Sequence, residues 1–137
     1  MKLLPVALAV FFRMKDDVLE LWTQIREDDG IYHGLLEFPG GKIEEGESAL
    51  QGAVREVLEE VGIEIVPRTG KLFGVYPLEL KDKTIVLNVF LFPDQESLVG
   101  KGEWLTITSS DLSEPYKGKI PTPNHQIIDD LYRALYS

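Results

Sequence analysis

The chain has 137 residues, of which 44% are hydrophobic and 27% charged, and its formal net charge is −9 at pH 7. These values predict one soluble domain over residues 1–137. The chain has no cysteine, which excludes disulfides and thiolate metal sites and leaves oxygen or histidine as metal ligands. A cytoplasmic location is compatible with this composition, and we expect it. The acidic charge argues against binding to nucleic acid, which needs clustered Lys and Arg.

The chain is predicted to begin with strands. Residues 3–12 are mostly apolar and predict a buried strand, although the run also resembles the core of a short signal peptide. The run is too short to span a membrane. Residues 18–26 alternate between apolar and polar side chains, as a hairpin partner would. A further short strand is expected over residues 35–38.

Residues 47–61 give the clearest helix prediction. Their apolar residues recur at helical spacing and form one stripe, and Gly62 is a natural helix terminator. Later strands are expected over residues 72–80, 84–92 and 103–107. A second helix is expected over residues 124–136, which also carry an apolar face. This order of strands, helix, strands and helix predicts an α/β fold in which helices pack on a mixed sheet.

Three carboxylates share one face of the first predicted helix. Glu56, Glu59 and Glu60 lie at positions i, i+3 and i+4, beside the apolar stripe. An acidic, solvated helix face is one interpretation. The other is a metal site, because the carboxylates repel one another and Mg²⁺ or Mn²⁺ prefers such oxygens and can bridge them to substrate phosphates. Gly52 is on the same face, where a missing side chain would leave room for a metal–phosphate group.

Two glycines and an arginine add to this pattern. Gly40 and Gly41 precede the helix, where they allow a tight turn and can offer a bare backbone carbonyl to a ligand. Arg55 lies four residues before Glu59, so the two side chains are neighbours on the helix surface. Arg55 could therefore orient Glu59, or the two could form a simple surface ion pair.

The segment from residue 41 to residue 63 resembles the Nudix box, a motif of glycine, glutamate, arginine and aliphatic residues at fixed spacing. Its defined positions are filled by Gly41, Glu47, Arg55, Glu56, Val57, Glu59, Glu60, Gly62 and Ile63. The resemblance implies an α/β/α sandwich around a mixed sheet and hydrolysis of a nucleoside diphosphate derivative with bound Mg²⁺, or Mn²⁺ in its place. It implies metal ligands at Glu56, Glu59, Glu60 and the carbonyl of Gly40. It also implies that Glu47 and Arg55 support catalysis.

Residues 36–44 further resemble the MutT branch of this family, whose enzymes remove oxidised guanine nucleotides from the nucleotide pool. This resemblance implies hydrolysis of 8-oxo-dGTP or dGTP to the monophosphate and pyrophosphate. Phe38 and Asn124 would bind the base, and Arg26 and Lys42 would face the phosphates. The alternatives are core packing for Phe38, helix capping for Asn124 and surface charge for the two cations.

The role implied for Asn124 has a physical rationale. Plain guanine presents two acceptors, N7 and O6, on one edge, whereas oxidation at C8 places a proton on N7. An Asn amide offers one donor and one acceptor. Asn124 would therefore pair with N7–H and O6 of the oxidised base together, but would lose one of these contacts with plain guanine.

The chain departs from the family pattern in three places, of which one is Gly52, where the family more often has alanine. The branch has a metal-binding glutamate in the loop before the strand at residue 103, and Glu96 is the candidate here although its spacing to Glu103 differs. Lys83 stands where the branch has a base-contacting arginine. These departures leave open the loop ligand, the general base and the number of metals.

Two other functions are alternatives. The first is a different Nudix diphosphatase, acting on ADP-ribose or a nucleotide sugar. ADP-ribose hydrolases usually carry a proline after the box, and Pro77 lies close to that place but does not match it. A non-catalytic nucleotide sensor is disfavoured, because such modules usually lose box glutamates that this chain keeps. We expect a small nucleotide substrate, no nucleic-acid or membrane partner, and a monomer or homodimer.

Overall fold

The computed structural model describes residues 2–27, 30–31, 33–112, 116 and 118–136. The strands are β1 (Lys2–Lys15), β2 (Val18–Ile25), β3 (Leu36–Glu37), β4 (Gly40–Lys42), β5 (Lys71–Glu79), β6 (Lys83–Pro93) and β7 (Glu103–Ile107). The α-helices of the described ranges are α1 (Ala49–Val61) and α2 (His125–Leu135). Within those ranges, no helix is long and apolar enough to cross a lipid bilayer.

The strands form one mixed sheet organised around β1. Strand β1 runs parallel to β6 and antiparallel to β2 and β4. Strand β5 pairs with β6, while β3 and β7 pair with β2. Each strand expected from the sequence is present, with ends that differ by up to three residues. The mixed sheet is therefore confirmed.

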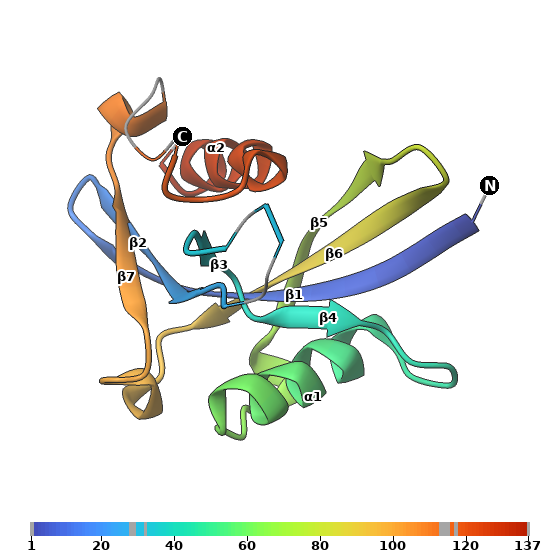
Figure 1. Cartoon of the computed structure of the whole chain (residues 1–137). Helices are drawn as coiled ribbons and strands as arrows, with labels where there is room; N and C mark the ends of the chain where they lie inside the picture. The colour runs from blue at the N-terminus through green and yellow to red at the C-terminus, as the bar shows by residue number, and fades with distance from the viewer. Residues whose placement is uncertain (1, 28–29, 32, 113–115, 117, 137) are drawn as a thin grey trace.

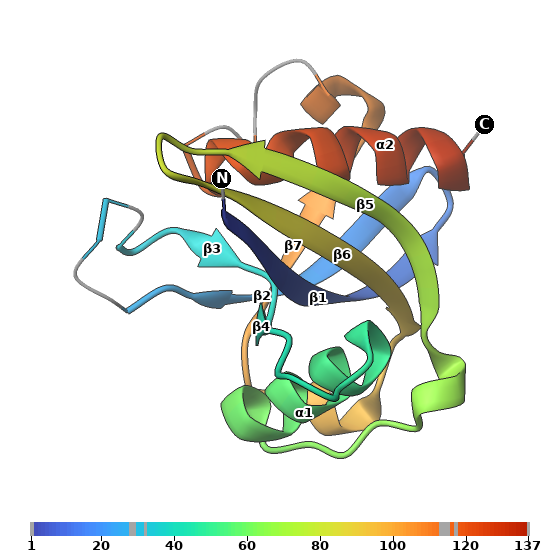
Figure 2. The same ribbon diagram turned by 90° about the vertical axis from the view of Figure 1, so that its right-hand side faces the viewer.

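Side chains alternate between the two faces of β1, and each face meets a different helix. Ala7, Ala9 and Phe11 pack with Ala53 and Val57 of α1. The cluster on the other face includes Val10, Leu19, Leu21, Val89, Ile127, Ile128 and Leu131. Figures 1 and 2 show α1 and α2 on opposite sides of the sheet. This arrangement confirms the predicted α/β/α sandwich.

Both ends of α1 follow from local hydrogen bonding. The Ser48 hydroxyl accepts from the Gln51 backbone N–H at 3.1 Å, and the Gln51 side chain accepts from the Ser48 N–H at 2.8 Å, which completes a capping box. Gly62 ends the helix with φ 79°, in the left-handed region that suits glycine. The helix was predicted to include Glu47, but the cap places Glu47 before it.

Helix α2 is held against the hairpin between β1 and β2 by two tyrosines. The rings of Tyr132 and Tyr136 stack with centroids 4.7 Å apart. Their hydroxyls donate to the carbonyls of Asp17 and Val18, at 2.9 Å and 2.6 Å. These contacts fix the rotation of α2 about its axis, and so determine where the residues at its N-terminal end lie.

Strand β4 is an element that the sequence did not predict. Two of its three residues are glycine, a poor strand former. Gly40 and Gly41 nevertheless pair with Leu8 and Ala7 of β1. A Cβ atom at Gly40 would overlap the Ala7 carbonyl oxygen, so this close approach of two backbones requires glycine. The pairing brings the segment that precedes α1 against the centre of the sheet.

Ile128 tests the packing of α2, because its side chain is fully buried. Ile128→Ala should lower the free energy of unfolding by about 2–5 kcal/mol, since truncation removes packing and leaves a cavity. The matched control Ile31→Ala, at a side chain that is 90% exposed, should change it by at most about 0.5 kcal/mol. Urea unfolding followed by circular dichroism measures both. Equal losses in the two variants would contradict this packing.

Candidate functional site: a carboxylate face beside a deep cavity

The Arg55 side chain ties the segment before α1 to the helix itself. Its guanidinium donates to both carboxylate oxygens of Glu47, through Nε at 2.8 Å and Nη2 at 3.0 Å. Nη2 also donates to the carbonyl of Lys42 at 2.8 Å. A guanidinium that binds a carboxylate through two parallel bonds is held in direction as well as position. The box residues Glu47 and Arg55 therefore form a rigid brace.

The same guanidinium also contacts two carboxylates of α1. Arg55 Nη1 lies 2.9 Å from Glu56 Oε1 and 3.2 Å from Glu59 Oε2. The contact with Glu59 is the one that the i, i+4 spacing predicted. These acidic neighbours, Glu47 first and then Glu56, hold the pKa of Arg55 far above its usual value. Arg55 therefore stays charged and compensates part of the acidic cluster.

Glu60 is held on the other side of the cluster by donors from two strands. Its Oε2 accepts from Gln24 Nε2 at 2.7 Å and lies 3.4 Å from the Gly40 N–H. The side chain remains accessible to solvent, but partial burial of its carboxyl group raises the pKa of Glu60 to about 7. The bonds from Gln24 and Gly40 oppose that rise in pKa, and nearby Glu56 adds to it.

The two glycines of β4 bring the backbone close to these carboxylates. The Pro39 carbonyl accepts from the Ala9 N–H of β1, and the Ile43 N–H donates to the Pro5 carbonyl of β1. In an antiparallel pair the alternate residue Gly40 therefore directs its N–H and C=O away from β1. A Cβ atom at Gly41 would lie 2.5 Å from the Glu56 carboxylate. A side chain at position 41 would displace the Glu56 carboxylate from this place, so the glycine lets the backbone of β4 and the carboxylates of α1 lie side by side.

Gly52 has a different role from the one expected. From the sequence, the absence of a side chain at Gly52 was expected to leave room for a metal–phosphate group. In the structure Gly52 is buried, and a Cβ atom there would lie 3.1 Å from Glu47 Oε1 and 3.4 Å from Ile43 Cγ1. Gly52 therefore makes room for the Glu47 side chain and the segment before the helix, and that hypothesis was wrong.

The carboxylates suit a hard divalent cation, although they do not form a complete set of metal ligands in this structure. Among the described residues, no three histidine, aspartate or glutamate side chains converge as a metal-binding group, since Glu59 turns toward Arg55. Glu56 and Glu60 do lie together, and their contact raises the pKa of Glu60. A cation between them would relieve this repulsion, and the oxygen donors fit Mg²⁺ or Mn²⁺.

A cavity of about 670 Å³ opens beside these carboxylates. One end is polar and is lined by Gly40, Gly41 and Glu60. Its walls are mostly apolar and include Val6, Leu8, Leu78, Ile85 and Leu87 from β1, β5 and β6. Such a volume and lining are typical of a small-molecule site with a few orienting polar groups.

Three predicted substrate-binding residues line this cavity: Arg26, Phe38 and Asn124. Phe38 is only 4% exposed and also belongs to the core cluster under α2, so it packs in the core and lines the cavity. Asn124 stands at the N-cap position of α2, yet its side chain makes no capping hydrogen bond. Arg26 lies 3.5 Å from Glu37, another residue of the lining.

The remaining predicted residues lie elsewhere. Lys42 and Lys83 are not among the described residues that line the cavity; the Lys42 side chain is exposed and its carbonyl binds Arg55. Glu96 is exposed and begins a short 3-10 turn, Glu96–Leu98, in which Leu98 is buried. In the described part of the chain, Glu96 makes no hydrogen bond or ion pair with the carboxylates of α1. Gln24 was missed, because nothing in the sequence joins it to Glu60.

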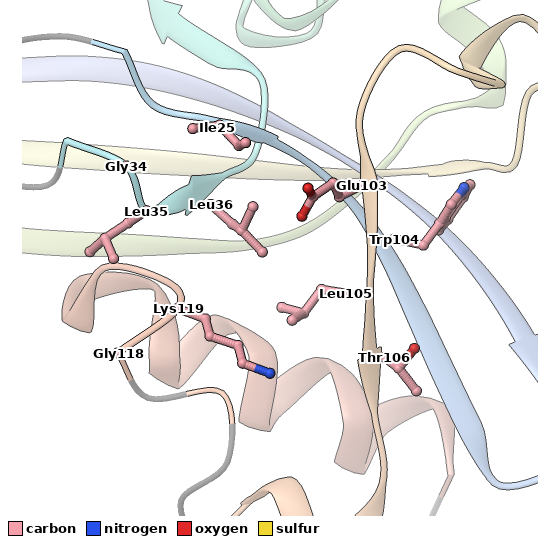
Figure 3. Close-up of a pocket in the computed structure, with 10 residues that line it drawn as sticks. All are labelled: Ile25, Gly34, Leu35, Leu36, Glu103, Trp104, Leu105, Thr106, Gly118 and Lys119. Carbon is pink, nitrogen blue, oxygen red and sulfur yellow. The ribbon is translucent and has the colours of Figure 1, made fainter.

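Two further hollows lie near the ends of β2 and β7. Figure 3 shows one of about 530 Å³, where Leu36, Glu103, Leu105 and Lys119 surround the space between β3 and β7. The other, of about 440 Å³, is lined by Gln24 together with residues of the loop before β7. Neither is lined by a carboxylate of α1, so the cavity that contains Glu60 is the better candidate for the functional site.

Comparisons with known proteins show the family to which the chain belongs. The chain matches the family model described as NUDIX domain over residues 2–122. It is 33% identical over 138 residues to the 8-oxo-dGTP diphosphatase of Escherichia coli (strain K12), covering 97% of this chain and 99% of that protein. It is 35% identical over 94 residues to the CTP pyrophosphohydrolase of the same organism, covering 69% of this chain and 65% of that protein. The crystal structure of the MutT protein from Methanosarcina mazei Go1 has a TM-score of 0.74 at 21% identity, covering 99% of this chain and 97% of that one.

The chain therefore belongs to the Nudix family, and the resemblance carried by the box is confirmed. It is a Nudix hydrolase, an enzyme that acts on the diphosphate linkage of nucleotides. Enzymes of this family act on small nucleotide substrates and generally use a divalent metal, typically Mg²⁺. The structural likeness at 21% identity shows the fold alone.

Glu47 gives a prediction about acid stability. Hydrogen bonds from Arg55 and from the Glu44 backbone lower the pKa of Glu47 to about 2 from 4.5. Because the folded-state pKa is depressed, the charged Glu47 stabilises the fold above about pH 4.5, and this stabilisation is lost as the pH falls toward 2. Glu47→Gln should therefore be less stable than wild type at pH 7, and the difference should shrink at pH 3. Urea unfolding at both pH values measures it. A difference independent of pH would contradict the brace.

Proposed function

We propose that the protein is a Mg²⁺-dependent pyrophosphohydrolase of guanine nucleoside triphosphates, with 8-oxo-dGTP or dGTP converted to the monophosphate and pyrophosphate. The observation that carries this proposal is the lining of one cavity. Phe38 and Asn124 lie in this lining together with Gly40, Gly41 and Glu60. A nucleotide whose base contacts Phe38 and Asn124 would place its phosphates beside the two glycines and Glu60. The E. coli relative named 8-oxo-dGTP diphosphatase supports the same substrate class.

The proposed metal ligands are Glu56, Glu59, Glu60 and the carbonyl of Gly40. Mg²⁺, or Mn²⁺ in its place, would supply charge neutralisation for the phosphates and an activated water. Burial raises the pKa of Glu60, and Glu56 lies near enough to add to this rise. Glu59 would need to exchange its bond with Arg55 for the metal, which is a change of side-chain rotamer only. Arg55 and Glu47 would keep the helix and the backbone of β4 at a fixed separation.

Asn124 is proposed to form hydrogen bonds with N7–H and O6 of the oxidised base. Its side chain does not cap α2, so its amide donor and acceptor are available to a ligand in the cavity that it lines. Phe38 would provide an apolar surface for the ring, and Arg26 lies in the same lining and could reach a phosphate or the sugar. Lys42, Lys83 and Glu96 are weaker candidates on this geometry, because the lining does not include them.

The expected partners follow from the same chemistry. The proposed substrate is a small nucleotide bound as its metal complex, which suits a chain with a net charge of −9. That charge disfavours nucleic-acid backbones. We further propose that residues 1–137 act as one domain, as a monomer or homodimer, in the cytoplasm, where nucleoside triphosphates are found. A role in cleaning the nucleotide pool would follow from these properties.

The direct test is a substrate screen with Mg²⁺. The purified protein is incubated with 8-oxo-dGTP, dGTP, dCTP, CTP, ADP-ribose and a nucleotide sugar, and the products are separated by ion exchange. Hydrolysis of the guanine nucleotides to monophosphate and pyrophosphate, with loss of activity in EDTA, is expected. Preferential cleavage of ADP-ribose or CTP would replace the proposed substrate. Release of inorganic phosphate as the first product would contradict the proposed reaction.

Glu60→Gln tests the metal assignment. Removing a hydrogen-bond partner of a metal ligand typically lowers metal affinity or activity by about 10–100-fold. Removing the ligand itself should therefore lower kcat by at least about a hundredfold. The fold should persist, because the side chain is not part of the core. Glu64→Gln, an equal change at an exposed residue just beyond α1, is the matched control. Wild-type turnover by Glu60→Gln would reject Glu60 as a ligand.

Asn124→Ala tests base recognition. If its amide pairs with N7–H and O6, the ratio of kcat/KM for 8-oxo-dGTP to that for dGTP should fall by about tenfold, the lower end of what one pocket contact contributes. Activity on dGTP acts as the internal control, since it should change less. An unchanged ratio would show that Asn124 does not distinguish the bases.

A further inference from the structure

Gln24 is a residue outside the Nudix box that reaches one of its carboxylates. It lies 36 positions before Glu60, and its Nε2 donates to Glu60 Oε2 at 2.7 Å. Its backbone pairs with Glu37 of β3, and the residues before it on β2, Trp22 and Thr23, are buried. The strand therefore fixes the origin of the Gln24 side chain, which extends from the sheet to α1.

Gln24 and the backbone of β4 both direct hydrogen-bond donors at the same oxygen of Glu60. The Gly40 N–H lies 3.4 Å from Glu60 Oε2, the atom that also accepts from Gln24. Neither donor uses Oε1. A glutamate at the surface of a helix has several rotatable bonds, and repulsion by Glu56 would favour rotamers that turn Glu60 into solvent. The two donors oppose that rotation and keep the carboxylate at the polar end of the cavity.

A neutral amide suits this task better than a cation would. Lys or Arg at position 24 would neutralise Glu60 and repel a metal ion. The Gln24 side chain donates a hydrogen bond without carrying charge, so it orients Glu60 without neutralising it. Arg55, the described cation in contact with the cluster, binds Glu56 and Glu59 and lies on the other side.

We propose that Gln24 is a positioning residue of this enzyme, whose amide holds the Glu60 carboxylate beside Gly40 and Glu56 in the arrangement that binds a divalent cation. The proposal rests on the proposed function, in which Glu60 is a metal ligand. Hydrogen-bond partners that orient metal ligands are known to raise metal affinity. Gln24 acts through Glu60 and would change the affinity for the cation before any nucleotide is present.

The test is Mn²⁺ binding by Gln24→Met, without nucleotide. Methionine keeps the length of the side chain and removes the donor. The hollow of about 440 Å³ that Gln24 lines gives the thioether room. Free Mn²⁺ is followed by electron paramagnetic resonance at neutral pH as protein is titrated. The dissociation constant for Mn²⁺ should rise about tenfold, while the melting temperature in EDTA should stay within about 2 °C of wild type.

Gln126→Met is the matched control. Gln126 makes the same kind of bond, from Nε2 to Asp130 Oδ1 at 2.8 Å, on α2, which lies across the sheet from the carboxylates of α1 (Figure 2), and it is not one of the described residues in the cavity lining. It should bind Mn²⁺ as wild type does. Gln24→Leu provides a second variant without a donor and decides the outcome if methionine destabilises the fold.

The outcomes separate this proposal from the proposed function. Mn²⁺ affinity that is unchanged in both Gln24 variants would overturn the positioning role and leave Glu60 as a metal ligand. Equal weakening in Gln24→Met and Gln126→Met would also overturn it, because the effect would not be local. Failure of the wild-type protein to bind Mn²⁺ would overturn both. Weakening confined to the Gln24 variants, with unchanged melting temperature in EDTA, is the supporting result.

Discussion

The guanidinium group of Arg55 joins three parts of the chain that would otherwise separate. It binds the carbonyl of Lys42 at the end of β4, both oxygens of Glu47 before α1, and the carboxylates of Glu56 and Glu59 on α1. Its side chain is 22% exposed, so these charges are screened less than surface pairs. Without Arg55, the carboxylates would repel one another and the segment from β4 to α1 would lose its anchor. The spacing between Glu47 and Arg55 in the box therefore has a structural meaning.

The sheet places the residues held by Arg55 beside a cavity that has a polar end and an apolar part. Strands β3 and β4 are separated by two residues. Phe38 lies between the two strands and lines the apolar part of the cavity, while Gly40 and Gly41 of β4 line its polar part. Asn124 arrives from the N-terminal end of α2, which lies on the opposite face of the sheet from α1 (Figure 2). A ligand in the cavity would therefore contact both helical layers of the sandwich. The proposed metal ligands on α1 and the proposed base-binding residue before α2 would then act on one molecule.

Contacts local in sequence could be predicted, and contacts between distant strands could not. Helix α1 and the pairing of Arg55 with Glu59 follow from helical periodicity, because both depend on residues a few positions apart. Strand β4 was missed, since its glycines form a strand only when β1 lies alongside. The contact of Gln24 with Glu60 depends on how β2 meets α1, which no spacing encodes. Gly52 was misassigned because its surroundings include Ile43, which β1 holds in place, and Glu47, which Arg55 holds in place.

We propose that Glu56, Glu60 and the Gly40 carbonyl form a divalent-metal site at the polar end of the cavity. A crystal grown with Mn²⁺ and examined at the manganese absorption edge would locate the ion. We expect an anomalous peak about 2.0–2.3 Å from oxygens of Glu56, Glu60 and Gly40, near the bond lengths of hard divalent cations. We also expect Glu59 to turn from Arg55 toward the metal. A peak bound elsewhere, or no peak at these residues under saturating Mn²⁺, would show that these residues do not hold the metal.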